Sequence, residues 1–248
     1  MKIYFASDFH LGAPNKEESA VREKRIVSWL DEIKADAKEI YLMGDLFDFW
    51  FEYKYVVPKG FVRFLGKIAE LTDSGIPVHL FIGNHDMWMF NYLEDELNVT
   101  IHRSHVTREF NGKKFFIGHG DGIGPGDYGY KFIKAVFANK ICQWLFARLH
   151  PNFAFAVANY WADKSRVDVN LLKFLGEENE HQIIFAKEML KSGHYDYFIF
   201  GHRHLPNDIK LSENSRYINL GDWIVNDSYA VFDGEELCLK KYSIHSNG

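Results

Sequence analysis

Five short clusters of histidine, carboxylate, asparagine and glycine recur along the chain, each directly after a run of residues typical of a buried strand. One cluster alone is usually a turn or a surface histidine, but five in order indicate a shared site, because buried imidazoles and carboxylates are costly unless paired or metal-bound. Ligands of an open α/β sheet bind beyond the carboxyl ends of its strands, so the fold must bring five strand ends together. The clusters are Ser7-Asp8-Phe9-His10, Gly44-Asp45-Leu46-Phe47-Asp48, Gly83-Asn84-His85-Asp86, Gly118-His119-Gly120-Asp121 and Gly201-His202-Arg203-His204.

The side chains in these clusters define the ligands that the site can offer. They supply carboxylate, imidazole and amide groups but no sulfur, which suits divalent ions such as manganese, iron or zinc. The chain has only two cysteines, Cys142 and Cys238, too few for a disulfide framework or a thiolate cluster. We therefore expect a reducing, cytoplasmic setting.

Between the clusters, the hydrophobic pattern alternates between strands and helices. Apolar residues at helical spacing form one face with Ile26, Leu30 and Ile33, and a second face over residues 61–71. A β-α-β-α order that closes with an antiparallel pair around Asp233-Gly234 predicts an α/β fold. The predicted strands are residues 3–6, 40–43, 78–82, 115–117, 197–200, 217–220, 229–232 and 237–242.

One long segment interrupts this alternation. Residues 122–190 contain no good strand pattern and read as helical throughout, so we expect a helical insertion in a single domain that spans residues 1–248. No linker or low-complexity tract flanks the segment, which predicts that it packs on the main body.

Composition excludes several classes of protein. The chain is 47% hydrophobic and 25% charged, as in a soluble globular protein, and its net charge of −5 argues against binding nucleic acid by bulk charge. The first six residues run into a polar segment, which predicts no signal peptide. Residues 144–162 are the most apolar stretch, but Arg148, His150, Pro151 and Asn152 interrupt it, so no membrane-spanning helix is expected.

The charge is unevenly distributed along the chain. Residues 122–166 hold six basic and two acidic residues, a net charge of +4, which leaves −9 on the rest. The same 45 residues contain ten aromatics, and a stripe of apolar residues falls at helical spacing, with Lys131 and Lys140 at its flanks. Most of this stripe is expected to pack on the body, while part of it could form a cationic, aromatic lid that receives acyl chains. The stripe consists of Tyr130, Ile133, Phe137, Ile141 and Trp144.

The order of the five clusters resembles the calcineurin-like metallophosphoesterase superfamily over residues 1–222. The resemblance implies a four-layer α/β/β/α sandwich with a helical insertion and a site for two divalent metal ions, manganese being expected and iron or zinc compatible. In that site two cations would activate a water and clamp the phosphoryl oxygens. The implied ligands are Asp8, His10 and His204 for one metal, Asn84, His119 and His202 for the other, and Asp45 between them.

Other residues of the clusters receive roles from the same resemblance. His85 would be the catalytic histidine that stabilises or protonates phosphoryl and leaving-group oxygens, and Asp86 would fix its tautomer. Asp48 would orient a ligand histidine without binding metal. Asp121 and Asp222 are expected to stabilise turns, or to contact a metal ligand without binding metal themselves. We expect structural or surface roles for the other seven histidines, which are His79, His102, His105, His150, His181, His194 and His245.

Within the superfamily, the layout resembles the UDP-2,3-diacylglucosamine pyrophosphatases of lipid A biosynthesis, on the motifs around Asp8, Asp45 and His119 and on Asp127-Tyr128-Gly129-Tyr130 and Asp163-Lys164-Ser165. This implies hydrolysis of a UDP-linked lipid to UMP and 2,3-diacylglucosamine 1-phosphate, by an enzyme peripheral on the cytoplasmic face of the inner membrane. The residues expected to contact substrate are Tyr130, Lys164, Ser165 and Arg166.

Two alternatives stay open at this point. The subfamily carries arginine where this chain has His85, which leaves room for a metallophosphodiesterase acting on another nucleotide or a phospholipid. A metal-free interaction scaffold would be expected to lack some of the implied ligands, whereas all seven are present. The sequence assigns no oligomeric state.

Overall fold

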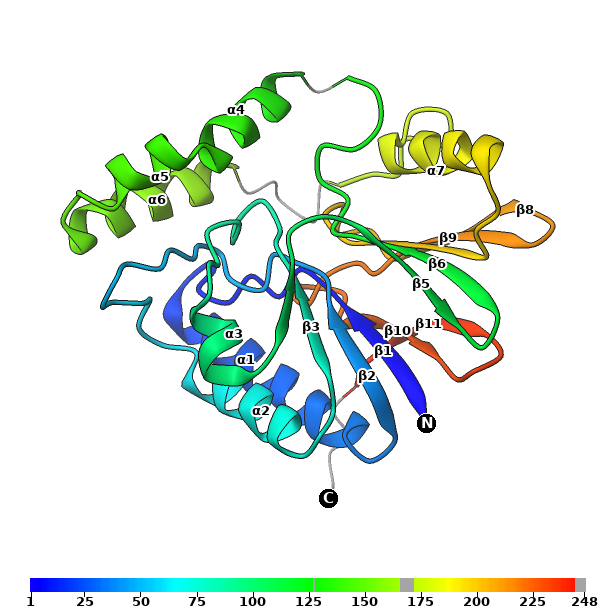
Figure 1. The fold of residues 1–248 in the computed structure, drawn as a ribbon, viewed down its shortest axis with the longest axis horizontal. Helices are drawn as coiled ribbons and strands as arrows, with labels where there is room; N and C mark the ends of the chain where they lie inside the picture. Colours follow the sequence, from blue (N-terminus) through cyan, green and yellow to red (C-terminus); the bar gives the residue numbers. More distant parts are fainter. Residues whose placement is uncertain (127, 166–171, 244–248) are drawn as a thin grey trace.

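The computed structural model describes the chain except for residues 127, 166–171 and 244–248, and for residues 163–165 it describes the backbone alone. Its centre is formed by two sheets that face each other (Figure 1). Eight of the strands are those that the hydrophobic pattern predicts, within three residues at each end.

The first sheet has the order β11-β10-β1-β2-β3-β4. Its four N-terminal strands are parallel, and β10 and β11 complete it as an antiparallel pair beside β1. The carboxyl ends of β1, β2 and β3 therefore lie at one edge. The strands are β1 (Lys2–Ala6), β2 (Ala37–Leu42), β3 (Val78–Phe81), β4 (Thr100–His102), β10 (Ser228–Phe232) and β11 (Leu237–Lys241).

The second sheet has the order β5-β6-β7-β9-β8. Its central strands β6, β7 and β9 are parallel, while β5 and β8 pair antiparallel at the two edges. The hydrophobic pattern did not predict β4, β5 or β8, which are short or alternate in exposure at the edges of the sheets. The strands are β5 (Val106–Phe110), β6 (Lys113–Ile117), β7 (Tyr197–Phe200), β8 (Asn207–Ser212) and β9 (Ser215–Asn219).

Helices cover the outer face of each sheet. The helices α1 (Lys16–Ile33), α2 (Val62–Asp73) and α3 (Tyr92–Leu97) lie on the first sheet, and α7 (His181–Ser192) lies on the second (Figure 1). The first helix begins at Asn15, whose side chain accepts from the Glu18 amide, and it buries the apolar face of Ile26, Leu30 and Ile33.

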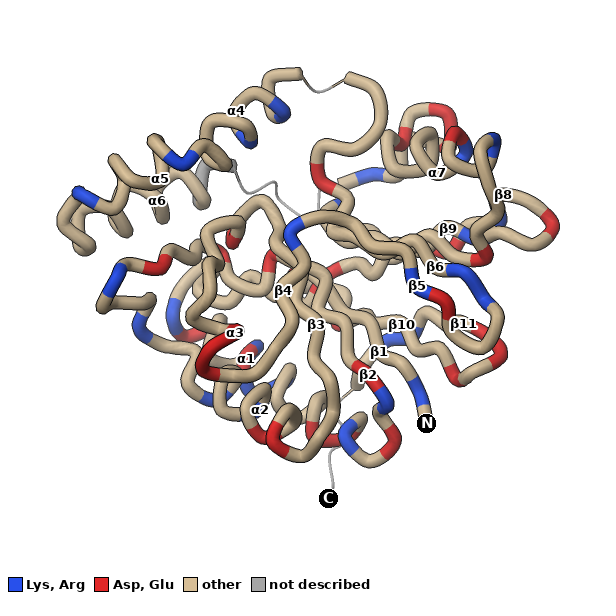
Figure 2. The backbone as a smooth tube through the Cα atoms, viewed as in Figure 1, with Lys and Arg blue, Asp and Glu red and all other residues tan. Residues whose placement is uncertain are grey.

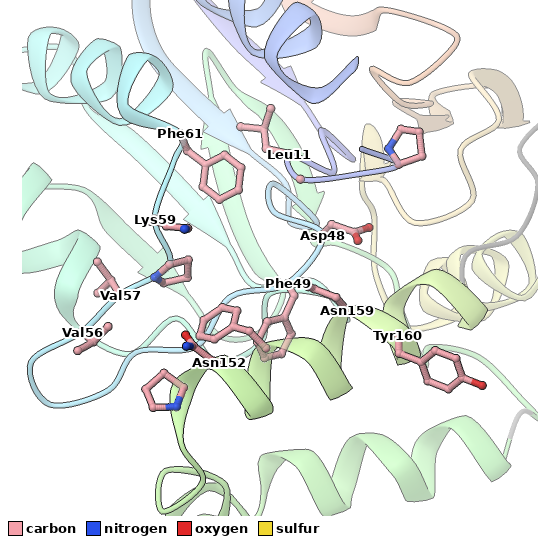
Figure 3. A pocket seen from close by; sticks show the side chains of 15 residues that line it. Leu11, Asp48, Phe49, Val56, Val57, Lys59, Phe61, Asn152, Asn159 and Tyr160 are labelled. Carbon is pink, nitrogen blue, oxygen red and sulfur yellow. The ribbon is translucent and has the colours of Figure 1, made fainter. Parts of the chain in front are cut away.

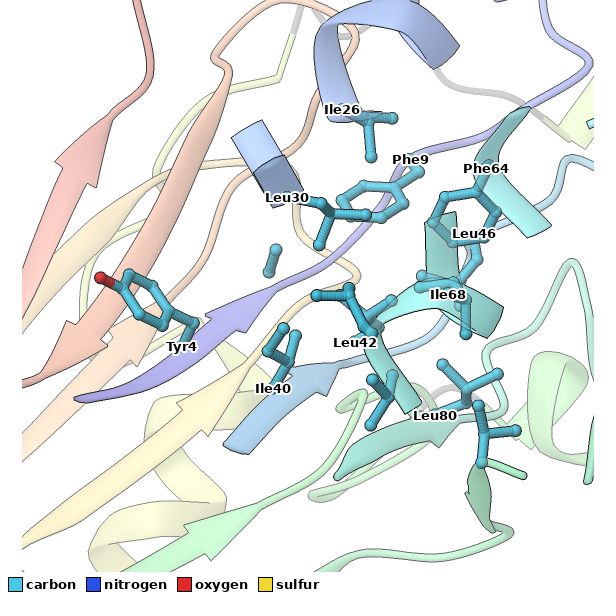
Figure 4. Close-up of a cluster of buried hydrophobic side chains, with 14 of the residues drawn as sticks. Tyr4, Phe9, Ile26, Leu30, Ile40, Leu42, Leu46, Phe64, Ile68 and Leu80 are labelled. Carbon is cyan, nitrogen blue, oxygen red and sulfur yellow. The ribbon is translucent and has the colours of Figure 1, made fainter. Parts of the chain in front are cut away.

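Three apolar clusters separate the four layers. The first lies between α1, α2 and the first sheet, where Leu30, Leu42 and Ile68 pack together (Figure 4). A second fills the space between the two sheets, and a third lies between the second sheet and α7. This succession confirms the predicted α/β/β/α sandwich.

The helices α4 (Tyr128–Ala138), α5 (Lys140–Phe146) and α6 (Pro151–Ser165) form a separate group above the sandwich (Figure 1). In contrast, α7 lies within the expected insertion of residues 122–190 but packs on the second sheet through Ile183 and Ala186. It belongs to the outer layer, and its apolar face explains why its pattern resembled that of the preceding helices. None of the described helices is long and apolar enough to cross a bilayer.

The expectation that residues 130–144 form one face of a single helix is wrong. The helix stops at Ala138, because the side chain of Asn139 accepts from the amides of Ile141 and Cys142 and begins a new helix. The first part of the stripe faces a cavity, whereas Ile141 and Trp144 are exposed.

An aromatic cluster joins the α4–α6 group to the sandwich. Trp88 contacts the rings of Phe51, Phe137 and Phe146, and its indole Nε1 donates to the Phe137 carbonyl at 2.8 Å. Phe49 also contacts Phe146, so loops after β2 and β3 hold α4 and α5.

Candidate metal centre

The loops that follow five parallel strands meet at one edge of the sandwich. The loops after β1, β2 and β3 come from the first sheet, and those after β6 and β7 come from the second. The structure therefore brings together the clusters that the sequence placed at strand ends. Three groups of side chains lie within 4.8 Å of one another through possible ligand atoms: Asp8, His10 and His204; His10, Asp48 and His85; and Asp45, His119 and His202.

The backbone at this edge is strained. The residues Asp8, His10, Asp45, His202 and His204 all have positive φ, between 43° and 68°. L-residues rarely adopt this conformation, which costs free energy unless the surrounding structure enforces it. Among described residues other than glycine, only four more have positive φ. The strain is thus concentrated on the expected ligands, as is typical of a functional site.

Glycines make the close approach of the loops possible. A methyl group at Gly83 would overlap Asp45 Oδ1, and one at Gly201 would overlap the side chains of Ser7 and Asp8. These positions are therefore restricted to glycine by the carboxylates themselves.

Asp8, His10 and His204 form the first group. Asp8 Oδ1 lies 3.3 Å from His204 Nε2 and 3.8 Å from His10 Nε2. The other group is formed by Asn84, His119 and His202. Asn84 Oδ1 lies 2.8 Å from His202 Nδ1 and 3.3 Å from His119 Nε2.

Asp45 lies between the two groups. Its Oδ2 is 3.8 Å from His10 Nε2 and 3.3 Å from His119 Nε2, so one oxygen faces a histidine of each group. Asp45 is 1% exposed, which removes its carboxylate from solvent.

The donor set fits a divalent cation. Nε2 of the buried His10 has no hydrogen-bond partner among the described residues. Burying such atoms is costly without a ligand. The Nε2 atoms of His10, His119 and His204 lie 3.3–3.8 Å from carboxylate oxygens of Asp8 and Asp45. These separations exceed ordinary hydrogen bonds, and the shorter ones match the spacing of about 3–3.5 Å between two atoms bound to one ion at about 2.0–2.2 Å.

The carboxylates give the site an excess of negative charge. Burial lowers the pKa of the His119 imidazole, but Asp45 and Asp8 outweigh this effect and raise the pKa to about 10. Burial and the neighbouring His119 lower the pKa of His202 to about 4, which keeps its ring neutral. A pocket that stabilises positive charge on one histidine and keeps another uncharged is suited to hold a cation.

Second partners orient several of these rings. His119 Nδ1 lies 2.8 Å from the Met43 carbonyl, which fixes the tautomer and leaves Nε2 toward Asp45. Asp48 Oδ1 lies 3.5 Å from His10 Nδ1, and Asp222 Oδ2 lies 3.4 Å from His204 Nδ1. Each of these carboxylates therefore lies beside Nδ1 of a histidine of the first group.

The expectation that Asp86 fixes the His85 tautomer is wrong. The Asp86 carboxylate accepts from the backbone amides of Gly83 and Leu46 at 2.7 Å and of Asp45 and Phe47 at 3.3 Å. It therefore ties the β2 loop to the β3 loop. His85 Nδ1 instead lies 3.0 Å from the Asp48 carbonyl, and burial lowers the pKa of its ring.

Sequence reasoning missed Gln182, which is 2% exposed in α7. Its Nε2 donates to the carbonyls of Gly201 at 3.0 Å and Gly120 at 3.2 Å, and its Oε1 accepts from Tyr217 and Asn219. The two glycines neighbour His202 and His119 in sequence. One buried amide therefore holds both histidine loops, and no local motif marks it.

Of the expected substrate contacts, the structure describes the side chain of Tyr130. The Tyr130 hydroxyl donates to Asp121 Oδ2 at 2.5 Å, and Lys134 contacts the same oxygen, so α4 is anchored two residues after His119. Arg166 lies outside the described residues, as do the side chains of Lys164 and Ser165.

None of the other described histidines belongs to the three groups of candidate ligands. His79 and His102 pack against each other between the sheets, and His105 stacks on Phe116. His245 lies outside the described residues.

A cavity of about 410 Å³ opens beside the metal centre. Asp48, Asn84 and His85 line its inner end, and Tyr130 and Lys134 contribute polar atoms from α4. The rest of the wall is apolar and comes from the loops after β2 and β3 and from α4, α5 and α6. These residues are Phe49, Met87, Trp88, Ile133, Phe137, Phe146, Val157, Ala158, Trp161 and Ala162.

A two-sheet sandwich with this centre at its strand ends is the arrangement of a metal-dependent hydrolase. Residues 1–206 match the calcineurin-like phosphoesterase family, and the chain belongs to that family. Its members act with divalent metal ions, for which the clustered aspartates and histidines are candidate ligands.

Curated relatives cover almost the whole chain. A protein of Porphyromonas gingivalis named UDP-2,3-diacylglucosamine hydrolase is 43% identical over 96% of this chain and 97% of its own length. A protein of Vibrio atlanticus with the same name is 26% identical over 97% of both chains. Among solved structures, the E. coli phosphoesterase Yfce aligns with 97% of this chain and 93% of its own, at a TM-score of 0.48 and 16% identity.

Proposed function

We propose that the chain is a two-metal hydrolase that cleaves the diphosphate of UDP-2,3-diacylglucosamine to UMP and 2,3-diacylglucosamine 1-phosphate. The observation that carries this proposal is the apolar cavity beside His85 and Asn84, whose volume of about 410 Å³ suits a flexible hydrocarbon chain. The names of the relatives from P. gingivalis and V. atlanticus support the same substrate.

Seven side chains are proposed to hold the two ions. Asp8, His10 and His204 would bind one, Asn84, His119 and His202 the other, and Asp45 both. This division is supported by the spacing of the two groups and by the position of Asp45 Oδ2 between their histidines. Manganese is the expected metal. Two divalent ions there would lower the pKa of a bound water and neutralise charge on the phosphoryl oxygens.

His85 is proposed to act on the leaving group. The Asp48 carbonyl can accept from Nδ1, which leaves Nε2 as the nitrogen that can hold a proton for a substrate oxygen. Its backbone amide donates to Asp45 Oδ1 at 2.8 Å, so the ring stays next to the proposed bridging carboxylate. Arginine could supply charge at this position but would not transfer a proton at neutral pH.

The α4–α6 group is proposed to be a lid that also rests on an anionic membrane surface. Lys131, Lys134 and Lys140 place positive charge along α4 and α5, and Arg148 adds another between α5 and α6 (Figure 2). Large apolar side chains are exposed beside them, as in interfacial helices. Binding to anionic vesicles that weakens with salt would test this role. The exposed apolar residues include Tyr128, Phe132, Ile141, Trp144, Leu145 and Phe153.

Product analysis tests the proposed reaction. The purified protein, supplied with Mn²⁺ and UDP-2,3-diacylglucosamine, should release UMP, and an Asn84→Ala or His119→Ala variant should lose this activity. Hydrolysis of other phosphodiesters without UMP release from this substrate would contradict the proposal and favour a general phosphodiesterase. A wild-type protein that binds no metal would contradict the metal centre itself.

A further inference from the structure

A second cavity, of about 690 Å³, adjoins the metal centre (Figure 3). Asp48 and Phe49 line it as well as the apolar cavity, so both spaces border the same loop after β2. Its other walls come from residues 11–14 directly after His10, from residues 56–61, and from α6. The metal centre therefore has two neighbouring cavities.

The two cavities differ in chemistry. In the larger one, α6 contributes Asn152, Phe155 and Asn159, which share one face of the helix at spacings of three and four residues. The side-chain amides of Asn152 and Asn159 lie about two helical turns apart along α6. Lys59 lies across the cavity from them, on the loop of residues 56–61 (Figure 3). In the apolar cavity, polar side chains are confined to the metal end and to two positions of α4.

The larger cavity also offers aromatic faces. The rings of Phe49 and Phe155 lie 5.2 Å apart and nearly perpendicular, and both line the space. A planar pyrimidine base needs an aromatic or apolar face for stacking, and hydrogen-bond donors and acceptors along its edge. A side-chain amide supplies both a donor and an acceptor, whereas an acyl chain gains nothing from either.

The substrate itself requires two exits from the metal centre. Its diphosphate carries a nucleoside at one end and the acylated sugar at the other, so the two substituents must extend from the metals in different directions. We propose that the 690 Å³ cavity binds the pyrimidine nucleoside and that the apolar cavity receives the acyl chains. This inference rests on the proposed function and assigns Asn152 and Asn159 to recognition of the nucleoside.

Binding of the two products tests the assignment without turnover. We would measure by calorimetry, in Mn²⁺, the dissociation constants of UMP and of 2,3-diacylglucosamine 1-phosphate for the wild type and for an Asn152→Ala, Asn159→Ala double variant. Both asparagines are exposed, so the fold should survive. Loss of two hydrogen bonds should weaken UMP binding by about tenfold or more and leave the lipid product within about twofold.

Ala156→Ser is the matched control, because Ala156 is exposed on the same helix and lines neither cavity. It should change neither constant. Unchanged UMP binding in the double variant would overturn the inference, and weaker binding of the lipid product alone would assign the cavity to a second acyl chain. A wild type that binds UMP but does not cleave the UDP-lipid would contradict the proposed function and leave the nucleoside site standing. No UMP binding would overturn the site.

Discussion

At the scale of single residues, the metal centre depends on backbone positions as much as on ligands. Gly83 approaches Asp45 so closely that a methyl group would overlap the carboxylate, and five expected ligands have strained, positive φ. Small changes in the backbone should therefore act on metal binding directly.

Gly83→Ala tests this dependence. The new methyl group would displace Asp45, and we expect loss of bound metal, at least about a tenfold loss of hydrolysis, and a destabilisation of about 1–3 kcal/mol. Metal analysis, activity and urea unfolding would measure the three effects. Gly66→Ala is the control, because Gly66 lies inside α2 with open space around it, and alanine there should stabilise by about 0.5–1 kcal/mol. Normal metal content in Gly83→Ala would contradict the argument.

His85 allows a second prediction at this scale. His85→Ala should lower kcat by about 10²–10⁴-fold with little change in metal content, because the ring is proposed to act on the leaving oxygen. His85→Arg should recover part of the rate by restoring positive charge, but its kcat should no longer follow a histidine pKa. Equal kcat values for the His85→Ala variant and the wild type across the pH range would exclude the role of the ring.

At the scale of elements, the most informative helix is α7, because it connects the outer layer to the metal centre. Gln182 bonds to the carbonyls of Gly120 and Gly201, while Arg203 forms a two-bond ion pair with Glu180 at 2.8 and 2.9 Å. These contacts place the loops of His119 and His202 relative to each other.

Gln182→Met would keep the side chain's length and remove its hydrogen bonds. We expect metal affinity to fall by about 10–100-fold, as for other residues that hold ligands in place, and measure it by titration of the metal-free protein. Glu188→Ala on the exposed face of α7 should leave affinity unchanged. Loss of stability with unchanged metal affinity would show that Gln182 serves the fold alone.

At the scale of the whole molecule, we expect the stability of the packing between the two sheets to depend on pH through His79 and His102. His102 Nε2 lies 3.1 Å from His79 Nδ1, and His79 stacks on Tyr41. The charges that act on these rings are Glu39 on β2, 3.7 Å from His79 Nε2, and Arg108 on β5. Burial lowers the pKa of both rings, and that of His102 falls to about 4.

Because both pKa values in the folded protein lie below the ordinary value near 6.5, the unfolded chain binds protons first as pH falls. The contribution of the two neutral rings to the free energy of unfolding is complete above about pH 6.5 and is lost as pH falls toward 4. A His79→Gln, His102→Gln variant should therefore lose less stability than the wild type between about pH 7.5 and 5.5 in urea unfolding. Equal losses would contradict this account.

Much of the fold could be predicted because its signals are local. Six strands follow from runs of β-branched and aromatic residues that stop at glycine or a carboxylate, and two more from the pair around Asp233-Gly234. The clusters after five of these strands contain the seven expected ligands. The helix break at Asn139 was missed, because a capping side chain interrupted an apolar spacing that continues past it. Edge strands such as β4 were missed because three residues carry too little pattern.

The sequence by itself determined the order of strands, the donor atoms at their ends and the family. Only the tertiary structure decided which other side chains hold the ligand loops in place and how the space around the metal centre is divided into cavities. Gln182 reaches loops 62 residues before it and 19 after it. Phe49 lines both cavities and contacts Phe155, from a distant part of the chain, in the wall of the larger one. Such contacts depend on the packing of layers, which short-range patterns do not encode.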